Sequence, residues 1–202
     1  MGLLTIWGLA QATTISVPGL DPEVLELALD AMECARKRGE LDRGDVLSVI
    51  DFRLPSTERR LWVIDLRREE ALFVERVAHG RNTGDNDAVS FSNRAGSNRS
   101  SVGLYRTGET YVGKHGRSLR LDGLEPGFND NARSRAIVVH AAGYATLDHV
   151  MRWGRLGRSE GCPALDPAVS DAVIDAIRDG TLLFAYYPEP SWLEGSRYLS
   201  CS

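Results

Sequence analysis

The chain has 202 residues, of which 43% are hydrophobic and 26% charged, and this length favours one domain with a sizeable core. The formal net charge of −4 argues against a nucleic-acid-binding protein, which would carry a basic excess for phosphate contacts. No stretch approaches the roughly 20 consecutive apolar residues of a membrane-spanning helix. Three cysteines are too few for a disulfide scaffold or a four-cysteine zinc site.

The amino terminus has a short apolar run, Leu3–Leu9, followed by Ala10-Gln11-Ala12, which fits the small-x-small pattern of a signal-peptidase site. A positive segment before the run is missing, so an amino-terminal strand or an unstructured leader is the alternative, and cleavage after residue 12 stays open. We interpret residues 1–20 as a candidate signal or leader segment. Residues 21–202 are expected to form a single domain with its core at about 46–187.

A helix is expected to begin after Asp21, which can cap it, with Pro22 in the first turn, where its missing N–H costs nothing. Gly39, after basic residues at 36–38, is expected to end the helix. Apolar side chains recur at helical spacing at Val24, Leu27, Ala31, Cys34 and Ala35. The pattern predicts a surface helix that covers a core.

The next part of the chain favours strands. Period-two alternation begins at Val46, and residues 61–66 and 71–78 read as a hairpin joined by residues 67–70. The polar segment 80–101 has no strong pattern, and an irregular stretch of that length inside a domain is usually a functional loop. Short strands are expected at Val102–Tyr105, Tyr111–Val112 and Ser118–Leu121.

In the carboxyl-terminal half, an apolar strand at Ala136–Val139 is expected to deliver His140 at its end. Residues 146–153 favour one or two helical turns. A second capped helix is expected from Asp166 to Gly180, and a last strand at Thr181–Tyr187. These elements predict a mainly β, β-rich α+β fold with two flanking helices.

Cys162 is the strongest candidate for chemistry, because it lies between Gly161 and Pro163 just ahead of a capped helix. A nucleophilic thiol needs open backbone, so that a carbonyl can approach the sulfur, and nearby N–H groups that bind the oxyanion. Glycine before the cysteine gives that access, and N–H groups at residues 160–162 are candidates for the oxyanion site. The alternative is a buried, inert cysteine.

His140 is the candidate base for Cys162. A thiol with an ordinary pKa near 8.5 is mostly protonated at neutral pH, so a histidine within hydrogen-bond reach would raise the thiolate fraction. Catalytic side chains are often carried where a strand ends and a loop begins. Taken alone, His140 would be read as a structural histidine; paired with Cys162, it becomes the favoured base.

These residues carry a family resemblance. The segments IVVHAAGYA and GRLGRSEGCPAL, with the stretch from Phe91 to His140, resemble the murein L,D-transpeptidase catalytic domain family of YkuD-type fold, in a divergent branch. The resemblance implies a β-rich fold with Cys162 as acyl-forming nucleophile and His140 as its base. It implies peptidoglycan stem peptides as substrate, with loss of a terminal D-alanine and transfer of the acyl group to an amine. It also implies a periplasmic or secreted protein.

The sequence departs from the commonest family motif at Glu160, where a histidine usually stands two residues before the cysteine. An anion there would raise the pKa of the Cys162 thiol unless the side chain turns away, so we expect Glu160 to point outward or to contact a substrate amine. Ser159 matches the family's serine or threonine, and we expect it to orient His140 or to line the oxyanion site. The family's third catalytic group is often a backbone carbonyl, which sequence does not identify.

Several residues are candidates for binding the substrate. Arginines recur at 152, 155 and 158, and the guanidinium fork suits carboxylates; Arg158 is nearest to the thiol. The alternative is ordinary solvated loop charge. Residues expected to line the groove are Arg158, Gly161, Tyr105, Tyr111 and His115, together with Arg106 and Arg117.

Two other sites are weaker readings. Residues 108–114 match most of a phosphate loop, but His115 stands where a serine or threonine must hold magnesium, and the interior favours a strand. A metal site from His140, His149 and Cys162 fits no zinc spacing. We therefore expect no cofactor and no metal, and a monomer is the simplest oligomeric state.

Cys34 and Cys201 are left over. In an exported protein a bond between them would join the first helix to the carboxyl terminus. The alternative is one core cysteine and one tail cysteine.

Three functions are compatible with these residues. The leading hypothesis is a peptidoglycan L,D-transpeptidase. The second keeps the site but uses water as acceptor, which gives an L,D-carboxypeptidase or endopeptidase. The third is a non-catalytic peptidoglycan-binding domain, which Glu160 favours.

Overall fold

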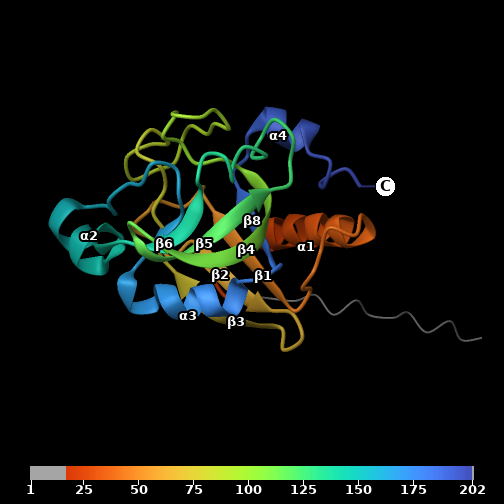
Figure 1. Ribbon diagram of the computed structural model, residues 1–202, viewed down its shortest axis with the longest axis horizontal. Coiled ribbons are helices and arrows are strands. Elements are labelled where there is room, and N and C mark those ends of the chain that lie inside the picture. The colour runs from red at the N-terminus through yellow and green to blue at the C-terminus, as the bar shows by residue number, and fades with distance from the viewer. Residues whose placement is uncertain (1–16, 202) are drawn as a thin grey trace, which may run out of the picture.

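The computed structural model describes residues 17–201, so the apolar run and Ala10-Gln11-Ala12 lie outside the described residues. One eight-stranded sheet organises the protein, in the order β3-β2-β1-β8-β4-β5-β6-β7 (Figure 1). Two neighbouring pairs, β1 with β8 and β6 with β7, are parallel, and the others are antiparallel. The strands are β1 (Val46–Asp51), β2 (Leu61–Asp65), β3 (Glu70–Glu75), β4 (Gly103–Gly113), β5 (Gly116–Gly123), β6 (Val138–Ala141), β7 (Ala164–Leu165) and β8 (Leu182–Tyr186).

The first helix, α1 (Pro22–Lys37), begins as predicted: the Asp21 carboxylate accepts a hydrogen bond from the Glu23 N–H at 2.9 Å. Its buried side chains pack on one face of the sheet, against alternate residues of the two central strands, such as Val49 of β1 and Phe184 of β8. Val17 and Leu20 are buried in the same core cluster. α1 therefore covers a core, as the spacing predicted.

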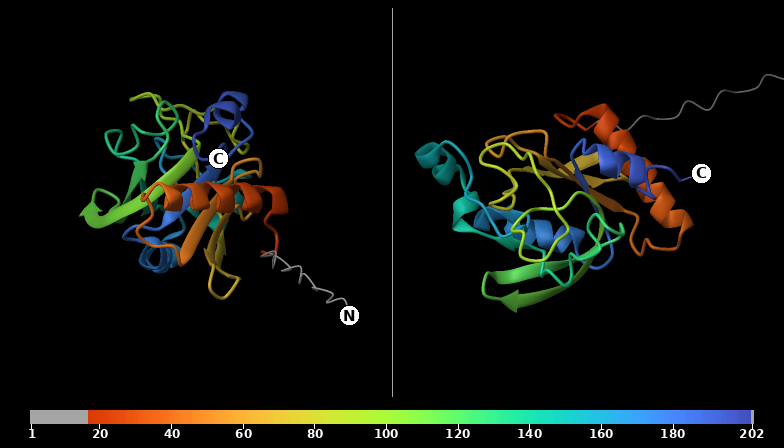
Figure 2. Two further views of the ribbon diagram at one scale, coloured as in Figure 1. Left: turned by 90° about the vertical axis from the view of Figure 1, so that its right-hand side faces the viewer. Right: turned by 90° about the horizontal axis from the view of Figure 1, so that it is seen from above.

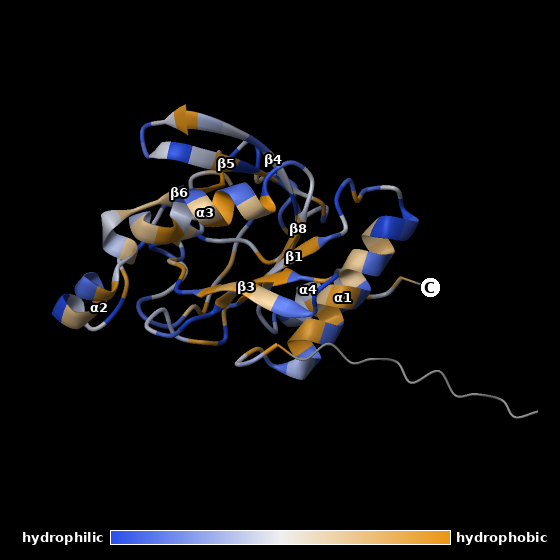
Figure 3. Ribbon diagram, turned by 90° about the horizontal axis from the view of Figure 1, so that it is seen from below, coloured by the Kyte–Doolittle hydropathy of each residue, from blue (hydrophilic) through white to orange (hydrophobic). Residues whose placement is uncertain are grey.

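The opposite face of the sheet carries a second core under α3 (Pro167–Ile177). Val173, Ile174 and Ile177 of this helix pack against the other set of alternate residues, such as Ile50 of β1 and Leu183 of β8. Polar and apolar residues alternate around both helices (Figure 3). Because β1 and β8 lie between the two cores, both faces of each strand are buried.

The structure corrects the prediction of separate short strands at 102–105 and 111–112. Residues 103–113 form one long strand, β4, paired with β5 in a hairpin that closes at Gly113 and Gly116. The pairing shifts register between Thr107 and Thr110, and the outer half of β4 extends past the cores (Figure 2). The outer residues need not alternate between apolar and polar, so the sequence pattern is weak there. Residues 108–113 belong to β4, and the next element is the strand β5 rather than the helix that would follow a phosphate loop.

Two shorter helices complete the fold, the first of them where one or two helical turns were predicted. Residues 147–153 form α2 (Leu147–Trp153), capped by Thr146, after a 3-10 turn at Gly143–Ala145. α4 (Pro190–Gly195) was not predicted from sequence; its Trp192 is buried in the first core. None of the helices described between residues 17 and 201 has the length and apolar character needed to cross a membrane.

A disulfide joins Cys34 of α1 to Cys201, with Cα atoms 5.6 Å apart. The pairing considered from sequence is therefore present, and Cys162 is the free cysteine. The bridge spans a sequence separation of 167 residues and fixes the carboxyl-terminal segment to the first helix.

Candidate active site

Cys162 and His140 line the same cavity of about 400 Å³. The wall is built by β6, by the loop that follows α2, and by the tip of the β4–β5 hairpin. The pocket lining comprises Arg81, Tyr111, Lys114, His115, Arg135, Ala136, Val138, His140, Tyr144, Arg158, Ser159, Glu160 and Cys162. Four of these thirteen side chains are arginine or lysine and one is acidic, so positive charge predominates in the lining.

The Cys162 side chain is half-buried, and backbone groups of the segment before β6 contact its sulfur. The Val138 N–H donates to Sγ at 3.4 Å, and Sγ lies 3.6 Å from the Ala136 carbonyl. Burial raises the pKa of the Cys162 thiol, whereas the Val138 N–H and the positive charges of Arg135 and Lys114 oppose that rise. The resting thiol is therefore protonated, and its nucleophilic form depends on a base.

The backbone before the sulfur needs a glycine. Gly161 has φ +124°, and a Cβ atom there would lie 2.7 Å from the Arg99 carbonyl. Its carbonyl accepts a hydrogen bond from Ser100 Oγ at 3.0 Å. Gly161 therefore allows the 80–101 loop to pack directly behind Cys162, but it is not among the residues that line the cavity, where it was predicted.

His140 lies within β6 rather than beyond its end, paired with Ser118 of β5 and Ala164 of β7. Nδ1 lies 2.8 Å from the Ala141 carbonyl, so a proton on Nδ1 is held there and Nε2 is left as the acceptor. The ring stacks on His115 at 4.3 Å between centroids. Burial lowers the pKa of His140, and the nearby His115 and Lys114 lower it further, so the imidazole is neutral.

Ser159 shapes the turn that carries Cys162. Its Oγ donates to the Cys162 carbonyl at 2.6 Å and accepts from the Gly161 N–H at 3.1 Å. Its backbone N–H donates to the His79 carbonyl at 2.9 Å. The hydroxyl is thus bonded to the turn itself and not to His140. This differs from the prediction that Ser159 orients the imidazole. The Gly161 N–H is also engaged, so it differs from the free donor expected for an oxyanion site.

A buried Arg60–His79 pair supports the segment to which this turn is bonded, and sequence reasoning missed it. Arg60 is fully buried and donates to the Val77 carbonyl, to the Leu54 carbonyl and to His79 Nδ1, each within about 3.1 Å. Burial lowers the pKa of Arg60 to about 9 and that of His79 to about 4. An arginine in a strand pattern is normally read as exposed, so no sequence signal identified the pair.

The predicted substrate-binding residues divide into two groups. Tyr111, His115 and Arg158 line the cavity, whereas the Tyr105 side chain is buried in the second core and its hydroxyl donates to the Ser101 carbonyl at 2.9 Å. Tyr105 occupies an inward position of β4, which is why it packs in the core rather than in the groove. Arg158 is held by Asp85 at 2.7 Å.

The arginines predicted beside Tyr105 and Tyr111 lie in ion pairs away from the cavity lining. Arg106 contacts Asp42 at 3.5 Å, and Arg117 contacts Asp175 of α3. Arg117 therefore ties β5 to the helix beneath it.

Four pocket residues with polar side chains were not predicted from sequence: Arg81, Lys114, Arg135 and Tyr144. Arg135 is half-buried and donates to neutral oxygens, including the Ser92 carbonyl at 2.8 Å and the Arg99 carbonyl at 2.5 Å. Burial raises the pKa of Tyr144 to about 12, so its hydroxyl stays protonated. These side chains lie in segments without periodicity, which gave no signal beyond composition.

Glu160 points to solvent, with 63% of its side chain exposed, and lies 3.7 Å from Arg81. The outward orientation agrees with the sequence-based expectation. Within residues 17–201, no group of three or more histidine, cysteine, aspartate or glutamate side chains is arranged to hold a metal ion.

The chain is similar to one family of known proteins and to several solved structures. A model of the L,D-transpeptidase catalytic domain matches residues 16–186. Similar solved structures include an L,D-transpeptidase from Mycobacterium smegmatis (14% identity, 71% of this chain and 59% of that chain, TM-score 0.45). Two others are L,D-transpeptidase 3 from Mycobacterium tuberculosis (14%, 71% and 61%, 0.45) and an L,D-transpeptidase from Stackebrandtia nassauensis (15%, 82% and 68%, 0.41).

The chain thus spans about three fifths of the length of the first of these structures. A search of curated proteins finds no sequence match. The family match covers most of the chain, including His140 and Cys162, and agrees with the sheet-dominated fold. The chain therefore belongs to the L,D-transpeptidase catalytic domain family.

Proposed function

We propose that the protein is a peptidoglycan L,D-transpeptidase with Cys162 as nucleophile and His140 as general base. The observation that carries the proposal is that thiol and imidazole line one open cavity, with Nδ1 of His140 held by the Ala141 carbonyl. That carbonyl takes the role of the third group that orients the base. Stem peptides of peptidoglycan, which carry several carboxylates, fit the basic lining of the cavity.

Acylation begins when His140 Nε2 accepts the proton of the Cys162 thiol as the sulfur attacks a stem-peptide carbonyl. Because burial disfavours both charged forms, the pair rests neutral, and proton transfer accompanies bond formation. A C–S bond forms, the amide C–N bond breaks, and the imidazolium returns its proton to the leaving amine of D-alanine. The product is a thioester on Cys162.

The tetrahedral intermediate needs donors for its oxyanion. Between residues 17 and 201, no hydrogen-bond acceptor contacts the backbone N–H of Glu160 or Cys162, whereas those of Ser159 and Gly161 are already engaged. We assign the two free N–H groups to the oxyanion site. An acceptor amine then attacks the thioester, a C–N bond forms, the C–S bond breaks, and the proton from the amine passes through His140 to the sulfur.

The cell envelope is the proposed location, because the substrate is found there. The Cys34–Cys201 disulfide supports this proposal, since such bonds persist in oxidising compartments and are rare in the cytosol.

The test is incubation of the purified protein with a disaccharide-tetrapeptide, followed by separation of the products. Cross-linked dimers are the expected result, and their loss in Cys162→Ala and in His140→Ala supports the assigned roles. Shortened monomers without dimers would indicate the hydrolase, with water as acceptor. Turnover by Cys162→Ala equal to that of the wild type would refute the cysteine mechanism.

A further inference from the structure

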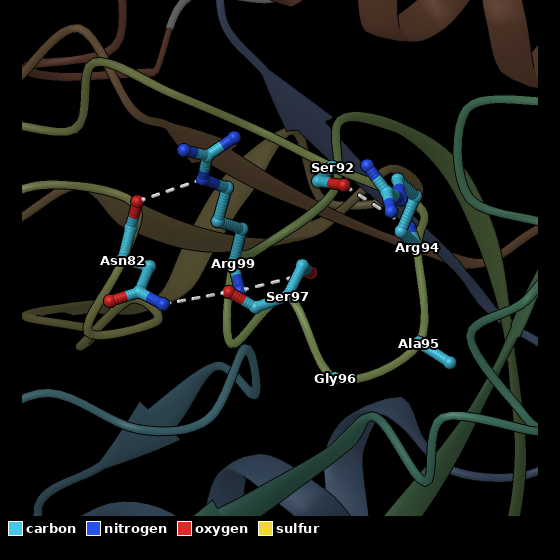
Figure 4. A pocket seen from close by; sticks show the side chains of 7 residues that line it. All are labelled: Asn82, Ser92, Arg94, Ala95, Gly96, Ser97 and Arg99. Carbon is cyan, nitrogen blue, oxygen red and sulfur yellow. Dashed lines mark hydrogen bonds between the residues drawn. The ribbon is translucent and has the colours of Figure 1, made fainter.

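A second cavity, of about 380 Å³, lies within the 80–101 loop (Figure 4). Arg94 and Arg99 are its charged lining residues. Asn82, Ser92, Ala95, Gly96 and Ser97 complete the lining. No acidic side chain lines the cavity, although the chain as a whole carries a net charge of −4. The excess of positive charge is therefore local.

The two arginines lack the acidic partners that two arginines of the catalytic pocket have. Arg81 is paired with Glu160 and Arg158 with Asp85. In the described part of the chain, the Arg94 guanidinium makes no hydrogen bond or ion pair, and the Arg99 guanidinium makes one bond, from Nε to the Asn82 carbonyl at 3.1 Å. The terminal nitrogens of both forks are free to bind an anion.

Hydrogen bonds within the loop hold the backbone that carries the two arginines. Asn82 Nδ2 donates to the Ser97 carbonyl at 2.9 Å, and Ser97 Oγ accepts from the Arg99 N–H at 3.3 Å (Figure 4). Ser92 Oγ accepts from the Arg94 N–H at 3.2 Å in the same view. These bonds order the backbone of the loop, whereas the Arg94 side chain is exposed.

Arg135 connects this cavity to the nucleophile. Its guanidinium lines the catalytic pocket and donates to the Arg99 carbonyl and to Ser97 Oγ. The Arg99 carbonyl also lies 2.7 Å from the position of a Cβ on Gly161, next to Cys162. Arg135 therefore lies between the two cavities and contacts residues that line both.

We propose that Arg94 and Arg99 form an anion subsite that takes a side carboxylate of the bound cell-wall peptide. The inference rests on the proposed function for the identity of the peptide, but the subsite itself rests on the cavity and its unpaired arginines. Planar guanidinium forks match a carboxylate in bidentate geometry, and they also bind phosphate, which is the other source of the same chemistry.

The test measures binding to full-length Cys162→Ala protein by calorimetry. Two stem peptides are compared, one with free side carboxylates and one with those groups amidated, and inorganic phosphate is the third probe. Arg94→Gln and Arg99→Gln are each introduced, with Arg67→Gln as matched control, because Arg67 is exposed in the β2–β3 turn on another part of the sheet.

Each cavity variant is expected to weaken binding of the free-carboxylate peptide about tenfold, because one charge-assisted hydrogen bond is lost. Binding of the amidated peptide should stay unchanged. Arg67→Gln should change neither. Equal losses for both peptides, or no loss for either, would overturn the subsite. Phosphate binding that depends on Arg94 and Arg99 without discrimination between the peptides would overturn its assignment to a peptide carboxylate.

Failure of the subsite is distinguishable from failure of the proposed function. In protein with Cys162 intact, iodoacetamide should alkylate the thiol at the same rate with or without Arg94→Gln. The reagent is too short to contact Cys162 and the cavity lined by Arg94 and Arg99 at the same time. A protein that binds the peptide in a carboxylate-dependent way but forms no cross-link would retain the subsite and lose the transpeptidase assignment.

Discussion

Removal of the Cys34–Cys201 disulfide should strongly destabilise the protein. In the chain-entropy model the cost grows with the logarithm of the loop, and the sequence separation of 167 gives about 5 kcal/mol. Native bridges typically contribute about 2–5 kcal/mol, and a domain of ordinary stability unfolds with about 5–15 kcal/mol. The expected loss is therefore a large share of the total, although the buried packing of α1 remains.

The assay is urea unfolding of the wild type and of Cys34→Ser/Cys201→Ser, followed by tryptophan fluorescence from the buried Trp62 and Trp192. Wild type treated with a reductant serves as the matched control, since it opens the same bond without changing the packing at either site. Both should lose stability by a similar amount. A loss under about 1 kcal/mol in both would refute the reasoning, because the bond would then constrain little of the unfolded chain.

Three further predictions concern the catalytic pocket. The acylation rate, measured by stopped flow, should fall at acid pH only below the lowered pKa of His140, which is under 6.5, because the base must be neutral to accept the thiol proton. His140→Gln should remove this acid limb of the pH profile. Glu160→Gln should lower the pKa of the Cys162 thiol and speed alkylation of that thiol at neutral pH, since the Glu160 charge raises the pKa. An unchanged alkylation rate would show that the Glu160 charge is screened. Gly80→Ala should reduce kcat at least tenfold while the far-ultraviolet circular dichroism spectrum stays native. The reason is that a Cβ there would lie 2.5 Å from the Asn98 carbonyl and 2.9 Å from Gly161 Cα. A wild-type kcat would mean that the loop adjusts without moving Cys162.

Sequence reasoning succeeded where one local pattern determines one element. Asp21-Pro22 and Asp166-Pro167 each start a helix, because a capping carboxylate and a proline in the first turn act over a few residues. The hairpin at 61–75 was also predicted, since two runs of β-favouring residues flank a short polar turn. The long strand β4 was not recognised as one element, because its outer half leaves the core.

The candidate site shows the same division. Cys162 and His140 were predicted as nucleophile and base from their residue types and positions, and both line one cavity in the structure. The surroundings were harder to predict because they depend on long-range contacts. Tyr105 and Tyr111 lie on one strand, yet the first is buried in the core and the second lines the cavity. Arg135 contacts the loop at 92–101, which no spacing rule connects to it.

The 80–101 loop explains why so polar a segment belongs inside a compact domain. Ser100 links three parts of the site: its Oγ accepts from the Gly80 N–H and donates to the Gly161 carbonyl, and its N–H donates to Thr83 Oγ1. Apolar side chains could not satisfy these backbone groups, and larger residues at Gly80 or Gly161 would collide with the opposing backbone. The turn bearing Cys162 is therefore positioned from behind by hydrogen bonds. Small polar residues and glycine are required there because they form these hydrogen bonds and leave room for the opposing backbone. Such requirements do not recur at a fixed spacing, so the segment shows no periodic pattern in the sequence.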